Sequence, residues 1–247
     1  MTGRQIALLA AVAFAIASPV VQAAGSIGLS ASEFSRSGDQ TLRAAGYAFS
    51  IWSLIYAGLV AFAIHQALPR QRDDRLLDAI WGPAFVAITG TGLWIWASAF
   101  DARWASVGII VVSAGWLTLG LVRAARTEPR PSLAARALVW WPLCLLAGWL
   151  TIASAINILT VMTAEGLLAD TPRAAAFAGI VAVLIVALLV LRTPRLSAHA
   201  IPIAWGLAAV WVAENGSKSD VAAVALASAV LVAAYAAWQS RPNAATR

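Results

Sequence analysis

Charged residues are scarce in this chain. Asp, Glu, Lys and Arg make up 11% of its 247 residues, whereas a soluble domain carries about 25%. Hydrophobic residues make up 61% of the sequence, and its mean hydropathy is +0.81. This composition excludes a soluble globular protein and indicates one that is embedded in a lipid bilayer.

Cysteine and catalytic motifs are also lacking. The single cysteine, Cys144, excludes an internal disulfide, and its place within an apolar run predicts a small packed side chain. The sequence has no P-loop, no His or Cys cluster with metal-ligand spacing and no G-x-S-x-G elbow. We therefore expect no catalytic residue, no metal site and no required cofactor.

Few titratable residues fall inside the apolar segments. No Asp, Glu, Lys or Arg lies centrally in any of them, which argues against an ion-coupled proton relay. His65 and His199 lie near segment ends, so we expect them to face the interface or a loop rather than to bind haem. Glu214 follows an apolar segment, and we expect it to be a solvated residue at a helix end.

The apolar residues occur in blocks of about 20, the length that crosses a bilayer as a helix. The sequence thus predicts an all-α polytopic membrane protein. Eight spanning segments are expected, over roughly 5–24, 45–68, 79–100, 104–122, 138–162, 174–191, 199–213 and 220–238.

The distribution of basic residues predicts the orientation. Of the 17 Lys and Arg residues, 12 fall in one alternating set of connections and termini, and five fall in the other. Because cytoplasmic loops carry the excess of Lys and Arg, we predict a multi-pass protein of the cell inner (plasma) membrane with both termini cytoplasmic. The larger set comprises Arg4, Arg70, Arg72, Arg75, Arg123, Arg126, Arg130, Arg136, Arg192, Arg195, Arg241 and Arg247. The loops expected to face outward are 25–44, 101–103, 163–173 and 214–219.

The first apolar segment has a second interpretation. Arg4, the apolar stretch 6–17 and the tripeptide "VQA" at 21–23 resemble a secretory signal with its cleavage site. The apolar run is longer than the hydrophobic region of most such signals, which favours a retained helix. Removal of residues 1–24 would leave the orientation of the later segments unchanged, so both interpretations stay open.

Aromatic and polar residues gather at similar depth in three segments. At about 1.5 Å per residue, Trp52 and Tyr56 lie from the outer half to the middle of the second segment. Asn157, in the outer half of the fifth segment, needs a polar partner or a wet cavity, because a carboxamide in hydrocarbon is costly. We expect a cavity here that suits a flat, largely apolar ligand, with simple helix packing as the alternative. Thr91 and Trp94 in the third segment, and Trp149 in the fifth, share this depth. The end-of-segment tryptophans, expected to form an interfacial belt, are Trp81, Trp104, Trp140, Trp141 and Trp238.

Three of these stretches resemble one family. Trp52-x-x-x-Tyr56 is similar to the W-x-x-x-Y element of the tryptophan-rich sensory protein family (TspO, related to the mitochondrial translocator protein). "TGLW" at 91–94 resembles the family's N-x-L-W, and "LLAGWLTIASAIN" at 145–157 resembles its P-Y-L-x-W-x-x-x-A-x-x-L-N signature. The matching positions in the last motif are Trp149, Ala153 and Asn157.

The resemblance covers about residues 1–165 and implies a five-helix TspO-like transmembrane domain, followed by a C-terminal transmembrane extension over 166–247. The chain departs from the family pattern in three places. The first loop lacks W-x-P-P, Thr91 stands in place of Asn, and Leu145-Leu146 stands in place of Pro-Tyr. The family binds porphyrins and other tetrapyrroles, and some members bind sterols. The ligand-binding residues implied are Trp52, Tyr56, Thr91, Trp94, Trp149, Ala153 and Asn157.

These residues lead to a hypothesis of function. The protein is expected to bind, sense or transport a hydrophobic planar ligand in the bilayer, namely a tetrapyrrole (porphyrin) or a sterol-like molecule. The alternatives are a membrane enzyme that photo-oxidatively degrades the bound porphyrin and a structural subunit whose aromatic residues only pack. The net charge of +6 is explained by topology, so no nucleic-acid partner is expected. Ala225, Ala229, Ala233 and Ala237 recur every four residues and predict either packing on the protein's own core or a homodimer seam.

Overall fold

The computed structural model describes residues 1–129 and 131–240. Every regular element in this part of the chain is helical, and eight helical segments are long and apolar enough to cross a membrane. The predicted all-α polytopic fold is therefore confirmed. The long helices are α1 (Gly3–Ala24), α3 (Ile51–Ala67), α4 (Arg75–Ala99), α5 (Arg103–Thr127), α7 (Trp141–Ala164), α8 (Pro172–Leu191), α9 (Ala200–Glu214) and α10 (Ser219–Gln239). The short elements are α2 (Ala31–Arg36), α6 (Leu133–Ala135), η1 (Gly46–Ser50), η2 (Pro69–Gln71), the π-helical turn η3 (Arg136–Trp140) and η4 (Pro194–His199).

Several helices begin at caps that the local sequence supplies. Thr2 with Gln5, and Ser30 with Glu33, form capping boxes at the starts of α1 and α2. The Asp74 carboxylate accepts a hydrogen bond from a backbone N–H in the first turn of α4. These side chains satisfy N–H groups that have no partner in the first turn of a helix.

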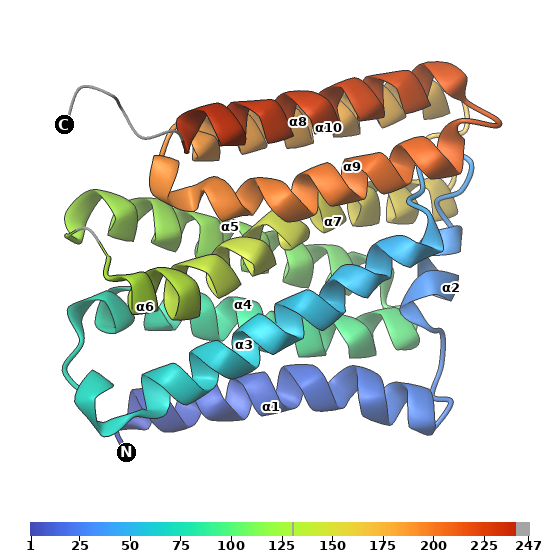
Figure 1. Ribbon diagram of the computed structural model, residues 1–247. Coiled ribbons are helices and arrows are strands. Elements are labelled where there is room, and N and C mark those ends of the chain that lie inside the picture. Colours follow the sequence, from blue (N-terminus) through green and yellow to red (C-terminus); the bar gives the residue numbers. More distant parts are fainter. Residues whose placement is uncertain (130, 241–247) are drawn as a thin grey trace.

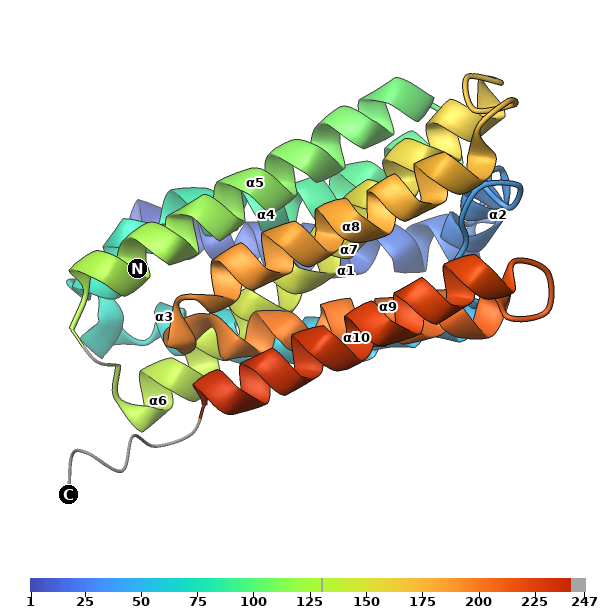
Figure 2. The same ribbon diagram turned by 90° about the horizontal axis from the view of Figure 1, so that it is seen from above.

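The spanning helices run roughly along one common direction and form a bundle around α7 (Figures 1 and 2). In the most apolar 18-residue stretch of each span, 72% of the α7 segment is buried, against at most 56% in any other. Helix α7 contacts α3, α5, α8 and α9, while α4 lies between α1 and α5. Residues on α7 therefore face the interior over most of the helix circumference, as the deep placement of Trp149 and Asn157 requires.

The bundle has two distinct ends. The start of α1 and the end of α10 lie at the same end of the bundle, on opposite sides of it, and we call this the terminal end (Figure 1). Helix α2 and the connections α4–α5, α7–α8 and α9–α10 lie at the other, which we call the α2 end (Figure 1). The terminal end is the one predicted to be cytoplasmic. Three of the basic residues that support that prediction, Arg130, Arg241 and Arg247, lie outside the described residues.

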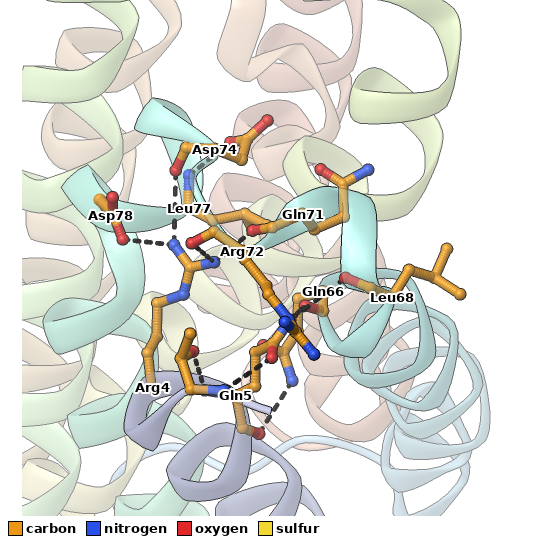
Figure 3. A network of polar contacts seen from close by, with 10 residues as sticks. Arg4, Gln5, Gln66, Leu68, Gln71, Arg72, Asp74, Leu77 and Asp78 are labelled. Atoms are coloured by element: carbon orange, nitrogen blue, oxygen red, sulfur yellow. Dashed lines mark hydrogen bonds and ion pairs between the residues drawn. The ribbon is translucent and has the colours of Figure 1, made fainter.

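At the terminal end, Arg4 and Gln5 fasten α1 to the connection between α3 and α4 (Figure 3). The Arg4 side chain is only 7% exposed, pairs with the Asp78 carboxylate and donates to backbone carbonyls of the α3–α4 connection. The Gln5 side chain donates to the Gln66 carbonyl at 2.8 Å, and the Gln66 side chain donates back to the Gln5 carbonyl at 3.1 Å. Residues that resemble the charged start of a secretory signal are thus integral to the packing of this end.

Four of the five belt tryptophans are exposed as expected. Trp81, Trp104, Trp141 and Trp238 are between 42% and 60% exposed, at the ends of spanning helices. Trp140 is the exception, because it is only 1% exposed and its ring packs inside the bundle. Successive residues on a helix point about 100° apart, and here Trp140 points into the bundle while Trp141 points out of it. The placement of Trp140 in the interfacial belt was therefore wrong.

Two of the three C-terminal helices, α8 and α9, pack on the rest of the bundle, and α10 packs mainly on α8 and α9. Helices α8 and α9 and the turn η4 all contact α7. Gly148 permits the closest approach, because a Cβ atom at this position would lie 2.2 Å from the His199 carbonyl oxygen. In α10, Ala225 and Ala229 are buried against the protein's own helices, whereas Ala233 and Ala237 are exposed. The four alanines therefore do not form one continuous packing surface. The boundary between residues 165 and 166 stays a prediction.

Candidate ligand-binding site

Six of the seven predicted site residues line one cavity in the half of the bundle nearer the α2 end. The cavity volume is about 50 Å³, and its walls come mainly from α7 and from the chain between residues 35 and 52, with further residues from α4 and α5. The lining residues that were predicted are Trp52, Thr91, Trp94, Trp149, Ala153 and Asn157. Helical spacing brings them together, since residues 149, 153 and 157 on α7 and residues 91 and 94 on α4 each share one face.

Tyr56 does not line the cavity. Its ring stacks on Trp52, with centroids 5.1 Å apart and ring planes inclined by 25°. Residues four apart on a helix are neighbours, so this pair forms along α3 rather than across the bundle. Tyr56 therefore packs against the ring of Trp52 and contributes nothing to the cavity wall.

The aromatic wall is built from edge-to-face contacts. The ring centroids of Trp149 and Trp52 lie 6.2 Å apart with an interplanar angle of 79°, and those of Trp149 and Phe49 lie 6.3 Å apart with an angle of 72°. The ring centroids of Phe34 and Trp94 lie 6.2 Å apart, and their planes are inclined by 88°. Such perpendicular pairs are favoured by the ring quadrupoles. The indoles thus form a compact wall, and Trp149 is only 5% exposed.

Polar groups follow one strip of the cavity. The Asn157 amide nitrogen donates to the Ser106 hydroxyl at 3.0 Å, and its oxygen accepts from the Trp94 indole N–H at 3.4 Å. Asn157 therefore fixes the indole of Trp94. The Thr91 hydroxyl donates to the Ile88 carbonyl at 2.7 Å. The Thr160 hydroxyl, also at the cavity, is buried and has no hydrogen-bond partner among the described residues.

Thr160 was missed by the sequence analysis, although a signal was available. It lies on α7 three residues after Asn157, so helical periodicity places it on the same face. Ser106 gave no comparable signal, because it pairs with a residue on another helix 51 positions away.

Helix α2 and the chain that follows it cover the cavity. Ser35, Ala44, Ala48 and Phe49 all line it, and we call residues 31–50 the cover segment. At its start, the Ser30 hydroxyl and backbone N–H donate to the Glu33 carboxylate. These hydrogen bonds stabilise the charged carboxylate and hold the pKa of Glu33 below its usual value.

The cover segment fits closely on α7. A Cβ atom at Gly38 would lie 2.6 Å from the Thr160 hydroxyl oxygen and 2.8 Å from the Thr160 Cα atom. The Thr163 hydroxyl, one turn further along α7, donates to the Thr41 hydroxyl at 2.6 Å. Any larger residue at position 38 would push the cover segment away from the helix.

The C-terminal extension holds the cover segment from its other side. The Lys218 ammonium group donates to the carbonyls of Asp39, Gln40 and Thr41 at 3.0–3.3 Å. It also pairs with the Glu214 carboxylate at 2.9 Å. The other carboxylate oxygen of Glu214 accepts from the Arg43 backbone N–H at 2.9 Å. Glu214 is only 1% exposed, so the expectation of a solvated residue at a helix end was wrong.

Helix α9 adds two contacts to the second half of the cover segment. The Trp205 indole N–H donates to the Ala48 carbonyl at 3.1 Å, and the Ala45 N–H donates to the Ala209 carbonyl at 3.0 Å. Ala48 lines the cavity, so α9 positions part of its wall. The extension is therefore structurally continuous with the site.

The cavity is small. Pockets for drug-sized ligands measure about 300–1,000 Å³, whereas this cavity measures about 50 Å³. A second hollow of about 360 Å³ shares Ser35, Ala44 and Phe49 with the cavity and carries Arg36 and Arg43. Displacement of the shared residues would join the two spaces.

Neither histidine belongs to the cavity. His65 is 6% exposed and His199 is 1% exposed, so the expectation that both face the interface or a loop was wrong. The His199 ring nitrogen Nε2 lies 3.3 Å from the Thr151 hydroxyl. Cys144 is fully buried, as its apolar surroundings predicted. The described residues contain no group of three or more His, Cys, Asp or Glu side chains that could hold a metal ion.

Comparison with known proteins gives one match. The family model described as "TSPO-like protein" matches residues 5–238. No curated protein and no solved structure matches the chain. The family match includes the three C-terminal spanning helices, for which the five-helix pattern offered no counterpart. Since the match covers nearly the whole sequence, the chain belongs to the family of TSPO-like proteins.

Proposed function

We propose that this membrane protein binds a flat, mainly apolar ligand of the tetrapyrrole class and acts as a receptor or transporter for it. One observation carries the proposal: aromatic and small residues from α3, α4 and α7 converge on a single cavity with a nearly apolar wall. Such walls provide stacking and edge contacts to a planar ring system. The free Thr160 hydroxyl supplies a polar contact beside them.

The ligand enters, in this proposal, when the cover segment moves. A cavity of about 50 Å³ is too small for a tetrapyrrole, so binding requires the cavity to widen. Displacing Phe49 and Ala44 opens the cavity into the hollow that bears Arg36 and Arg43. Acidic substituents of a tetrapyrrole would replace the carboxylates in the exposed pairs that Arg36 makes with Glu33 and Arg43 makes with Asp39, while its ring reaches the aromatic wall.

We also propose that the protein lies in the cell inner membrane with its α2 end facing away from the cytoplasm. The excess of basic residues in the connections of the terminal end supports this orientation. The cover segment and its entrance would then face outward.

Titration of the purified protein with protoporphyrin tests the proposed function. A shifted and then stable absorption spectrum, with saturation at one ligand per chain, is the expected result. Light-dependent bleaching of the bound compound would indicate a degrading enzyme instead. An unchanged spectrum would show that the deep aromatic residues only pack.

A further inference from the structure

A third hollow, separate from the two described above, lies at the terminal end of the bundle. Its volume is about 300 Å³, and it is bordered by η3, η4 and the end of α10. The side chains that decide its chemistry are Arg136 and Trp140 on η3 and Arg195 and Ser197 on η4. We call it the terminal-end pocket.

The terminal-end pocket carries two positive charges without a counter-ion. No acidic residue is among its described lining residues, and no ion pair in the described chain includes Arg136 or Arg195. Arg195 is held in place because it donates to the Glu128 carbonyl at 2.7 Å and to the Pro129 carbonyl at 3.2 Å. The Arg136 side chain makes no hydrogen bond to the described residues, so its guanidinium group is available to a ligand.

Trp140 adds a buried donor to these charges. The residue is 1% exposed, and its indole N–H has no acceptor in the described part of the chain. Buried N–H groups without a partner are rare and unfavourable. The indole nitrogen itself is buried, so an acceptor oxygen from the pocket would reach and stabilise it only after a small shift of the pocket wall. Trp140 closes a π-helical turn, an element that often marks functional positions in helices.

Two neighbouring tryptophans indicate the position of the pocket relative to the membrane surface. Trp141 follows Trp140 and is 43% exposed, and Trp238, at the end of α10, is 60% exposed. Exposed tryptophans at the ends of spanning helices lie at the level of the lipid headgroups. The pocket is therefore at the level where phospholipid phosphates are located.

We propose that the terminal-end pocket binds the phosphate group of an anionic phospholipid. A phosphodiester offers only acceptor oxygens, which suit the guanidinium groups of Arg136 and Arg195 and the N–H of Trp140. Basic pockets between membrane helices recognise anionic headgroups through the same chemistry. The proposal does not depend on the ligand of the aromatic cavity.

Lipid titration of the full-length protein in neutral detergent tests the site. Native mass spectrometry would measure the apparent Kd for phosphatidylglycerol, with phosphatidylcholine as the neutral lipid. Arg136→Gln should weaken phosphatidylglycerol binding about fivefold. Trp140→Phe, which removes the N–H and keeps an aromatic ring, should weaken it as well. Arg126→Gln is the matched control, because Arg126 is an exposed residue near the same end and does not line the pocket.

Three results would overturn the proposal. Equal losses of affinity in Arg136→Gln and Arg126→Gln would mean that only the general positive charge attracts the lipid. Equal binding of phosphatidylcholine by the native protein would mean that charge is not recognised. Inorganic phosphate that displaces the lipid and itself binds as tightly would assign the pocket to a soluble phosphate compound.

Discussion

Lys218 and Glu214 form an ion pair that joins the C-terminal helices to the cover of the cavity. The ammonium nitrogen lies 2.9 Å from the carboxylate, and the two side chains are 13% and 1% exposed. Both residues of the pair are hydrogen-bonded to the cover segment. Glu214 accepts a hydrogen bond from the Arg43 N–H, and Lys218 donates to three successive carbonyls. Residues more than 170 positions apart in the sequence thus meet at one point.

Replacing Lys218 with Met should loosen the cover segment. The substitution leaves the buried Glu214 carboxylate without its counter-ion, and breaking such a pair costs about 3–5 kcal/mol. We expect a loss of about 3 kcal/mol in the free energy of unfolding and faster hydrogen exchange in residues 38–45. Arg173→Gln is the control, because its pair with Asp220 is 61% and 44% exposed. If both variants lose the same stability, Lys218 has no special role in the cover.

Replacing Trp149 with Leu should weaken binding of protoporphyrin by about 5- to 30-fold, since it removes an aromatic face and part of the contact area. Stability should fall as well, because Trp149 is 5% exposed and contacts Phe49 and Trp52. Binding is therefore measured well below the melting temperature of the variant. Trp81→Leu, at an exposed position near the terminal end, should bind like the native protein. Unchanged affinity in Trp149→Leu would make the tryptophan a packing residue.

Thr160→Val and Thr163→Val should have opposite effects on stability. The Thr160 hydroxyl is buried without a partner among the described residues, so its replacement by a methyl group should stabilise the unliganded protein by about 1 kcal/mol. The Thr163 hydroxyl is hydrogen-bonded to Thr41, so its loss should destabilise the protein by about 1 kcal/mol. Thermal unfolding in detergent measures both changes. Thr160→Val should also weaken protoporphyrin binding, and unaltered binding would remove the hydroxyl from the proposed site.

The orientation prediction is tested by reporters fused in the loops. A reporter after Thr127, between α5 and α6, should be cytoplasmic, and one after Gly166, between α7 and α8, should be outside. The reverse pattern would place the cover segment in the cytoplasm. It would also remove the outward-facing entrance from the proposed function.

The spanning helices could be predicted because hydropathy and helix length are local properties. Their ends were less accurate: α5 continues to Thr127, whereas the apolar run was expected to end at 122, and α4 starts at Arg75 instead of 79. Polar turns at helix ends lie in the headgroup region, where hydropathy no longer distinguishes a helix from a loop.

The cavity wall was predictable for a similar reason. Trp149, Ala153 and Asn157 follow the helical repeat, so their common face could be inferred from sequence alone. The position of the cover segment could not be inferred in this way. Residues 25–50 have no sustained hydrophobic period, and contacts from α7 and α9 hold them in place. Glu214 was misplaced for this reason, since its burial depends on the backbone of Arg43.

The central position of α7 has a consequence for biosynthesis. Helix α7 belongs to the fifth span to leave the ribosome, so the four preceding spans enter the membrane before their most buried neighbour exists. Cavity-lining residues on α3 and α4 then face lipid or one another until translation passes residue 160. The cover segment is fixed in place later still, because Lys218, which donates hydrogen bonds to its carbonyls, is synthesised only after α9. Closure of the site is thus among the last events of assembly.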